Sequence, residues 1–311
     1  MNKIKDYLKV LKNSFGCFIE DNAFKLSASL SYYTIFSLGP VLIIVISLAG
    51  VFFGREAVEG RIFWQLKGLV GKDAAIQVQE IIKNTQQTGD STTGTIIGII
   101  LLIVGATGVF IEIQDSINYI WSVKAKPKKG WLKFLKNRFL SFSLVVSMGF
   151  ILLVSLIVSA MLTALSDVFM KYFSDNLMFI FHILNFIIIL AVITALFAVI
   201  FKVLPDAHIS WKDALIGSGF TALLFILGKL GINLYLSKSD VGSTYGAAAS
   251  IVILITWIYY SSLILYFGAE FTKINALTLG KGIKPNENAV YIIRSEAREA
   301  PHVKEVPRQE I

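Results

Sequence analysis

The fold is decided by residues 177–236, which read LMFIFHILNFIIILAVITALFAVIFKVLPDAHISWKDALIGSGFTALLFILGKLGINLYL. Two apolar runs, 177–204 and 212–236, are separated only by the segment LPDAHISW at Leu204–Trp211. Each run is long enough to cross the hydrocarbon core of a bilayer, which takes about 20 residues of helix. Pro205 cannot continue a helix, so this segment is expected to be a turn. We therefore expect two neighbouring, antiparallel membrane-spanning helices.

The rest of the chain has the same apolar character. Its 311 residues are 55% hydrophobic and 16% charged, against about 25% charged in ordinary soluble proteins. The mean hydropathy is +0.68. A soluble fold of this size cannot bury so much apolar surface, which excludes a soluble enzyme. Four further runs of spanning length lie at 27–53, 94–121, 139–166 and 246–271. The sequence thus predicts an all-α, polytopic integral membrane protein with six transmembrane helices.

The basic residues predict the orientation of these helices. Of the 29 lysines and arginines, 21 fall in segments on the same side as the N-terminus, 7 fall in the opposite segments, and Lys229 lies within a span. Short loops rich in lysine and arginine stay in the cytoplasm. We therefore expect both termini to be cytoplasmic. The net charge of +8 then reflects loops that face anionic membrane lipids, and no nucleic-acid partner is expected.

Three segments lie outside the predicted transmembrane domain of residues 27–271. Residues 1–26 carry apolar side chains at helical spacing with lysines between them, which indicates a cytoplasmic amphipathic helix. This helix lies either in the membrane interface or against the underside of the bundle. The external loop 54–93 contains two short amphipathic patterns and is expected to form an outer helical cap. The cytoplasmic tail 272–311 is rich in charge and proline and is expected to be mostly disordered.

Residues for catalysis or metal binding are few and far apart. The three histidines, His182, His208 and His302, fall at an outer helix end, an inner turn and the tail. Cys17 is the only cysteine, and no glycine-rich phosphate loop is present. We expect no enzyme activity, no metal site and no cofactor.

One group of polar residues falls near the predicted cytoplasmic ends of two spans. Glu112, Asp115 and Asn118 recur every three residues along one helix face, and Glu270 lies near the end of the sixth span. Carboxylates in lipid must be paired or hydrated. We expect these four residues to form a cytoplasmic polar cluster. The alternative is an ordinary interfacial ion network with lysines of the inner segments, namely Lys202, Lys212 or Lys273.

A second group lies toward the outer side. Lys229 and Asn233 are on the fifth span, and His182 and Asn185 are at a comparable depth on the fourth. No acidic residue lies at that depth in any span, so the counter-charge of Lys229 is expected to be an anionic substrate group. In the alternative, Lys229 extends to the outer headgroups. Gly39 and Pro40 should kink the first span, either as a functional hinge or as a passive bend.

Four segments together resemble the YihY/BrkB family of bacterial inner-membrane proteins. They are ASLSYYTIFSLGP at 28–40, INYIW at 117–121, KVLPDAHISWKDALIGSGF at 202–220 and STYGAAASIVILITWIYYSSLILYFGAEFT at 243–272. The resemblance implies a six-helix protein of the bacterial cytoplasmic membrane. An older name for the family, ribonuclease BN, finds no support in these residues. Some relatives have been connected with movement of lipids or lipid-linked glycans.

These observations lead to one expected function and one alternative. We expect a protein that binds or translocates an amphiphilic anionic molecule, such as a lipid or lipid-linked molecule, with membrane lipids as its partners. The alternative is a non-transporting scaffold for envelope proteins. A membrane-bound hydrolase would need a catalytic cluster that these residues do not supply. The sequence leaves the oligomeric state open.

Overall fold

The computed structural model describes residues 3–54, 108–126, 175–238 and 248–292, together with positions 56, 59–60, 62–64, 75–76, 78–80 and 83. The predicted span at 139–166 and most of the loop 54–93 lie outside the described residues. The described part is mostly helical. Its long helices are α1 (Lys3–Glu20), α2 (Ala23–Phe53), the helix 108–120, α7 (Asp175–Val203), α8 (Trp211–Lys238) and α10 (Ala249–Thr278).

Three of the described helices are long and apolar enough to cross a membrane. These segments are Phe186–Val203 of α7, Trp211–Ile232 of α8 and Ile251–Thr278 of α10. They correspond to the predicted fourth, fifth and sixth spans. The predicted bounds of the fourth and fifth spans differ by only a few residues from those of α7 and α8. The sixth was predicted to end at residue 271, but α10 continues to Thr278. The structure therefore confirms the helical fold, and three of its described helices have the length and composition of membrane spans.

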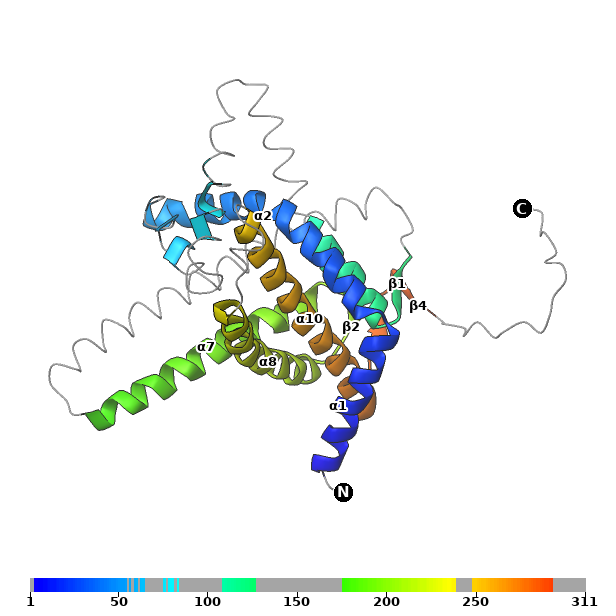
Figure 1. The fold of residues 1–311 in the computed structure, drawn as a ribbon. Coiled ribbons are helices and arrows are strands. Elements are labelled where there is room, and N and C mark those ends of the chain that lie inside the picture. Colours follow the sequence, from blue (N-terminus) through cyan, green and yellow to red (C-terminus); the bar gives the residue numbers. More distant parts are fainter. Residues whose placement is uncertain are drawn as a thin grey trace, which may run out of the picture.

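Helix α10 is the centre of the described fold. It packs against α1, α2 and α8 (Figure 1). Helix α7 in turn packs against α8, as expected for the antiparallel pair. Helix α8 begins where it does because Ser210 caps it. The backbone N–H of Asp213 donates to Ser210 Oγ at 3.1 Å, and the Ser210 hydroxyl donates to Asp213 Oδ2 at 2.6 Å. The first of these bonds satisfies one of the free backbone donors of the first helical turn, and the second orients the Ser210 hydroxyl.

Helix α1 has two apolar faces with different surroundings. Val10, Ser14 and Phe18 are buried, and the Phe18 ring packs edge-on to Phe267 of α10 at 5.6 Å. This contact corresponds to one of the two predicted positions of the helix, packing against the bundle. A second stripe of the same helix is exposed, with Leu8 and Phe15 each 60% exposed. Burial against α10 therefore leaves an apolar face that the described chain does not cover.

Two small antiparallel sheets join the tail to the segment that follows the helix 108–120 and to the α7–α8 turn. Strand β1 (Val123–Ala125) pairs with β4 (Ala289–Tyr291), and β2 (Ala207–His208) pairs with β3 (Lys284–Pro285). The prediction of a mostly disordered tail from residue 272 is therefore wrong for residues 272–292. The tail is ordered there because its backbone hydrogen-bonds to both segments and Ile283 enters the core. The remaining residues, 293–311, lie outside the described part.

These contacts bring four chain segments to one end of the described fold. They are the α1–α2 turn, the segment 121–126, the α7–α8 turn and residues 279–292 (Figure 1). All four were predicted to be cytoplasmic. Away from this end, Val78 of the loop 54–93 is buried with Ile46 of α2 and Leu254 of α10. The described positions of that loop are almost all helical, while the outer cap as a whole stays a prediction.

Candidate functional site

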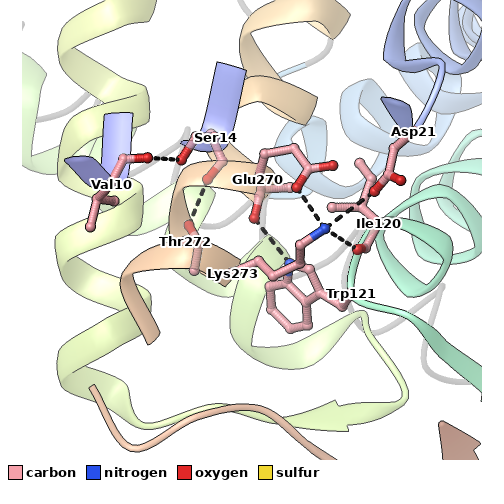
Figure 2. A network of polar contacts seen from close by, with 10 residues as sticks. Val10, Ser14, Asp21, Ile120, Trp121, Glu270, Thr272 and Lys273 are labelled. Carbon is pink, nitrogen blue, oxygen red and sulfur yellow. Dashed lines mark hydrogen bonds and ion pairs between the residues drawn. The ribbon is translucent and has the colours of Figure 1, made fainter. Parts of the chain in front are cut away.

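A buried polar network of the described chain is centred on Lys273, in the last turns of α10. Its ammonium lies 2.8 Å from Glu270 Oε2 and 3.2 Å from Asp21 Oδ2. It also donates to the backbone carbonyl of Ile120 at 2.7 Å. Figure 2 shows the side chain pointing at all three partners. One lysine thereby ties α10 to the α1–α2 turn and to the end of the helix 108–120.

This network is largely removed from water. The side chain of Glu270 is 0% exposed, that of Asp21 4% and that of Lys273 12%. Charges at such depth are stable only when they are paired and hydrogen-bonded. Trp121 closes the same region, since its indole N–H donates to the carbonyl of Ala269 at 3.1 Å (Figure 2). The arrangement is a buried ionic junction at the end of the described fold where the four chain segments meet.

The predicted cytoplasmic cluster is divided between two networks. Glu270 contacts Lys273, which is one of the lysines named in the alternative prediction. Asn118 instead holds the α7–α8 turn. Its Nδ2 donates to Asp206 Oδ2 at 3.0 Å, and the backbone N–H of Asp206 donates to Asn118 Oδ1 at 2.8 Å. Gln114 adds a third bond to Asp206 at 3.2 Å.

The other two members of the predicted cluster lie beside these networks. Glu112 is half-buried on the helix 108–120, whose core residues Ile113 and Ile117 pack in one cluster with Tyr266 of α10. Asp115 is exposed. Helix 108–120 therefore faces α10 one turn from Glu270, and no contact between Glu112 and Glu270 is found in the described chain. Whether the four residues act together stays a prediction.

Sequence reasoning missed two acidic residues of this region, Asp21 and Asp206. Both lie in short turns outside the apolar runs, where an acidic side chain is ordinary. The one feature of the sequence that could have pointed to them is their position, because each lies next to a helix end on the predicted cytoplasmic side. Neither contact could be inferred from the sequence. Asp21 and Lys273 are 252 residues apart in the chain, and Asp206 and Asn118 are 88 residues apart.

Lys229 shares one face of α8 with two residues that pack into the bundle. It follows Ala222 by seven residues and Phe225 by four, which places all three on one helix face. Ala222 is fully buried, and Phe225 contacts both Phe197 of α7 and Trp257 of α10 at ring distances of 6.0 Å. A different face of α8 carries the exposed residues Leu227, Leu230 and Leu234.

The rest of the predicted outer group is only partly described. Lys229 is half-buried and makes no ion pair or hydrogen bond within the described residues. His182 and Asn185 lie on α7 and Asn233 lies on α8, but the side chains of these three residues are outside the described part. Their meeting with Lys229 stays a prediction. The same holds for the kink at Gly39 and Pro40, although α2 changes direction along its length in Figure 1.

Cys17 is the titratable neighbour of the Lys273 network on α1. Burial raises the pKa of its thiol, Lys273 acts in the opposite direction, and Glu270, Glu20 and Asp21 raise it further. Burial is the largest of these effects. A reactive cysteine needs a lowered pKa, so this environment does not activate the thiol. Among the described residues, no group of three or more His, Cys, Asp or Glu is placed to hold a metal ion.

Comparisons with known proteins agree with these features. The family model described as virulence factor BrkB matches residues 14–289. A membrane protein named UPF0761 from Verminephrobacter eiseniae is 29% identical over 79% of this chain and 57% of its own length. Its counterpart in Pseudomonas paraeruginosa is 29% identical over 81% of this chain and 59% of its own length. The one from Alcanivorax borkumensis is 25% identical over 88% and 61%.

The chain therefore spans somewhat less than two thirds of the length of these relatives. Their names state a membrane protein and no enzymatic activity. No solved structure matches the chain. The family match begins within α1 and ends in β4, so it includes the Lys273 network, the Asp206 turn and Lys229. The chain belongs to the virulence factor BrkB family of membrane proteins.

Proposed function

We propose that this protein spans the cytoplasmic membrane six times, with both termini inside, and binds or translocates an amphiphilic anionic molecule such as a lipid or lipid-linked molecule. The topology rests on the distribution of basic residues and on the four gathered segments. Alternating spans with a cytoplasmic N-terminus put the start of α2, the α7–α8 turn and the end of α10 on one side. These are the segments that share contacts in the described fold.

Helix α1 fits the inner interface in this arrangement. Its exposed stripe consists of Leu8, Leu11, Phe15 and Ile19. The exposed lysines Lys5, Lys9 and Lys12 border that stripe on the helix surface. An apolar face flanked by lysines suits the boundary between acyl chains and anionic headgroups. We place α1 there, with its other face held on α10.

The observation that carries the proposed binding function is Lys229. An ammonium inside a span costs about 2.5 to 3.5 kcal/mol on insertion scales. Lys229 shares a helix face of α8 with the buried Ala222, and it has no counter-charge among the described residues. The phosphate or carboxylate of an amphiphile supplies that charge, while its chains stay in the surrounding hydrocarbon. The exposed leucine face of α8 gives those chains an apolar surface.

Lipid retention by the purified full-length protein tests this function. The protein in detergent is equilibrated with a defined mixture of phosphatidylglycerol and phosphatidylcholine, and the retained lipid is measured by mass spectrometry. We expect preference for phosphatidylglycerol, a several-fold loss of that preference in Lys229→Met, and its preservation in Lys229→Arg. Lys212→Met is the matched control, because it removes an exposed positive charge at the inner end of the same helix.

Two results would count against the proposal. Equal retention by Lys229→Met and the wild type would remove Lys229 from the site. A wild-type protein that retains neither lipid would favour the alternative of a non-transporting scaffold.

A further inference from the structure

The α7–α8 turn carries two nitrogen donors side by side on its outward face. His208 of β2 and Lys284 of β3 are direct partners in the antiparallel register. Directly opposite residues project from the same face of a sheet, with Cβ atoms about 4.5–5.5 Å apart. Both residues are exposed, whereas Ala207, which precedes His208 in β2, is buried. The face of this sheet that is turned away from the core therefore presents an imidazole beside an ammonium.

A third nitrogen donor reaches the same turn from α7. Lys202 donates a hydrogen bond to the backbone carbonyl of Ile209, the residue after His208. Its ammonium also lies 5.6 Å from the centre of the Trp211 ring. A lysine ammonium has three N–H donors, so two remain beyond the bond to Ile209. We call Lys202, His208 and Lys284 the α7–α8 basic patch.

No acidic side chain of the described chain neutralises this patch. Asp206, in the same turn, accepts hydrogen bonds from the helix 108–120 instead. Asp213, in the first turn of α8, is buried and accepts hydrogen bonds from within the protein. Glu287, three residues after Lys284, forms no ion pair with any member of the patch in the described fold. The described residues thus leave the charge of the two lysines uncompensated.

An apolar surface begins next to the patch. The candidate span of α7 ends at Val203 and that of α8 begins at Trp211, so the patch lies where this helix pair leaves the hydrocarbon. Trp211 and Leu215 are 58% and 48% exposed. Their spacing of four residues puts them on one face of α8, which runs from the turn into the span. Tryptophan is typical of the boundary between headgroups and acyl chains.

We propose that the α7–α8 basic patch binds the anionic headgroup of a phospholipid, with an acyl chain of that lipid along Trp211 and Leu215. Ammonium and imidazole N–H groups donate to phosphate oxygens, and the bonds from an ammonium are charge-assisted. Basic pockets at the ends of membrane helices bind anionic headgroups for this reason. A soluble phosphate compound meets the same donors but leaves the exposed face of Trp211 and Leu215 uncovered, which favours the lipid.

This site is separate from the one proposed at Lys229. It lies toward the opposite end of α8, and in the proposed topology it contacts the inner leaflet. It holds a lipid of the surrounding leaflet at the turn and requires no movement of that lipid across the membrane. It therefore stands or falls independently of the function proposed for Lys229.

Photocrosslinking of the purified full-length protein in lipid nanodiscs tests this site. The probe is phosphatidylglycerol with a diazirine next to its headgroup, and phosphatidylcholine with the same group is compared with it. Crosslinked peptides are identified by mass spectrometry. We expect phosphatidylglycerol to label the α7–α8 turn and β3 several-fold more than phosphatidylcholine does. His208→Ala combined with Lys284→Ala should reduce that labelling several-fold, while Lys284→Arg should preserve it.

Lys124→Ala is the matched control, because Lys124 is an exposed lysine of β1, in the other small sheet at the same end of the described fold. It should leave the labelling unchanged. Lys229→Met should also leave it unchanged, which separates this site from the proposed function. Lys284→Ala alone keeps the test decisive if the double variant does not fold.

Three results would overturn the proposal. Equal labelling of the turn by the two lipids would show that the patch does not select an anionic headgroup. Unchanged labelling in the double variant and in Lys284→Ala would show that the patch does not hold the lipid. Displacement of the phosphatidylglycerol probe by inorganic phosphate, but not by chloride of the same ionic strength, would assign the patch to a soluble phosphate compound.

Discussion

Thr272 of α10 packs directly over Gly217 of α8, so closely that no side-chain carbon fits at position 217. The same contact occurs once more in the reverse sense, with Thr221 of α8 over Gly268 of α10. Each threonine hydroxyl donates to the glycine carbonyl four residues earlier in its own helix, at 2.7 Å. The two helices thus carry one pattern, GSGFT at 217–221 and GAEFT at 268–272. Small residues at such crossings let membrane helices approach and gain van der Waals contact.

Gly217→Ala should destabilise the protein, because the added methyl group meets Thr272. Overpacking of this kind typically costs about 1–3 kcal/mol. Gly219→Ala, two residues away on the same helix, meets no atom within 4 Å and should be neutral or stabilising, because alanine is the better helix former. Thermal unfolding in detergent, followed by size-exclusion chromatography, compares the two. Equal midpoints would show that the close approach does not limit stability.

The hydrogen bonds between Asn118 and Asp206 should hold the α7–α8 turn on the helix 108–120. Asn118→Ala removes two of them and leaves a half-buried carboxylate with fewer partners. A loss of about 1–3 kcal/mol is expected. A double-mutant cycle with Asp206→Ala should give a coupling energy of about 0.5–3 kcal/mol. Additive effects would contradict the pairing, and Lys124→Ala on the exposed side of β1 is a control for nonspecific change.

The helices were predictable because hydrophobic length alone identifies a span. The α7–α8 pair followed from one proline turn, and the described bounds differ from the predicted ones by only a few residues. The polar contacts were harder to predict from the sequence. Asn118 and Glu270 were recognised as polar residues near water, but Asp206 and Asp21, which complete their networks, lie 88 and 252 residues from the groups they contact. At a membrane surface many side chains are possible partners, so spacing does not select one.

The strands of the tail were missed for a different reason. Strands of two or three residues are too short to show an alternating pattern. Proline and charge in the tail suggested disorder, but Pro285 forms part of β3. The order comes from tertiary pairing with two distant turns, which local composition does not record.

Two truncations should distinguish how much residues 281–292 and residues 293–311 of the tail contribute to stability. Deletion of residues 293–311 is expected to leave stability unchanged, because that segment belongs to the tail that the sequence predicts to be mostly disordered. Deletion of residues 281–311 should lower the unfolding midpoint clearly, since it removes β3, β4 and the buried Ile283. Expression level and thermal unfolding of the two truncated proteins measure this. Equal stability of both would show that the two sheets contribute little.

The proposed topology predicts opposite labelling of two exposed positions. In a Cys17→Ser background, Glu80→Cys in the predicted outer loop should react with a membrane-impermeant maleimide in intact cells. Lys284→Cys on β3 should react only after the cells are opened. Both native side chains are exposed in the described fold, so burial does not explain a difference. Labelling of Lys284→Cys in intact cells would place the tail outside and reverse the topology.

Cys17 gives a pH-dependent test of the environment of α1. Because burial raises the pKa of its thiol, alkylation of the folded protein should reach half its maximal rate at a higher pH than alkylation of a free cysteine. Lys273→Met should move the midpoint higher still, since the ammonium opposes the effect of burial. Glu20→Gln should move it lower, because Glu20 raises the pKa. Mass spectrometry of the alkylated chain is unambiguous, since Cys17 is the only cysteine.

The raised pKa of the Cys17 thiol also determines whether folding stability rises or falls with pH. A thiol whose folded pKa is raised binds its proton more tightly in the folded state than in the unfolded state. Its contribution to stability is therefore complete below the unfolded pKa and is lost as the pH rises through the folded value. Wild type should lose more stability than Cys17→Ser above about pH 9, near the ordinary thiol pKa of 9.0. Identical losses for the two proteins in that range would show that the Cys17 thiol does not titrate with folding.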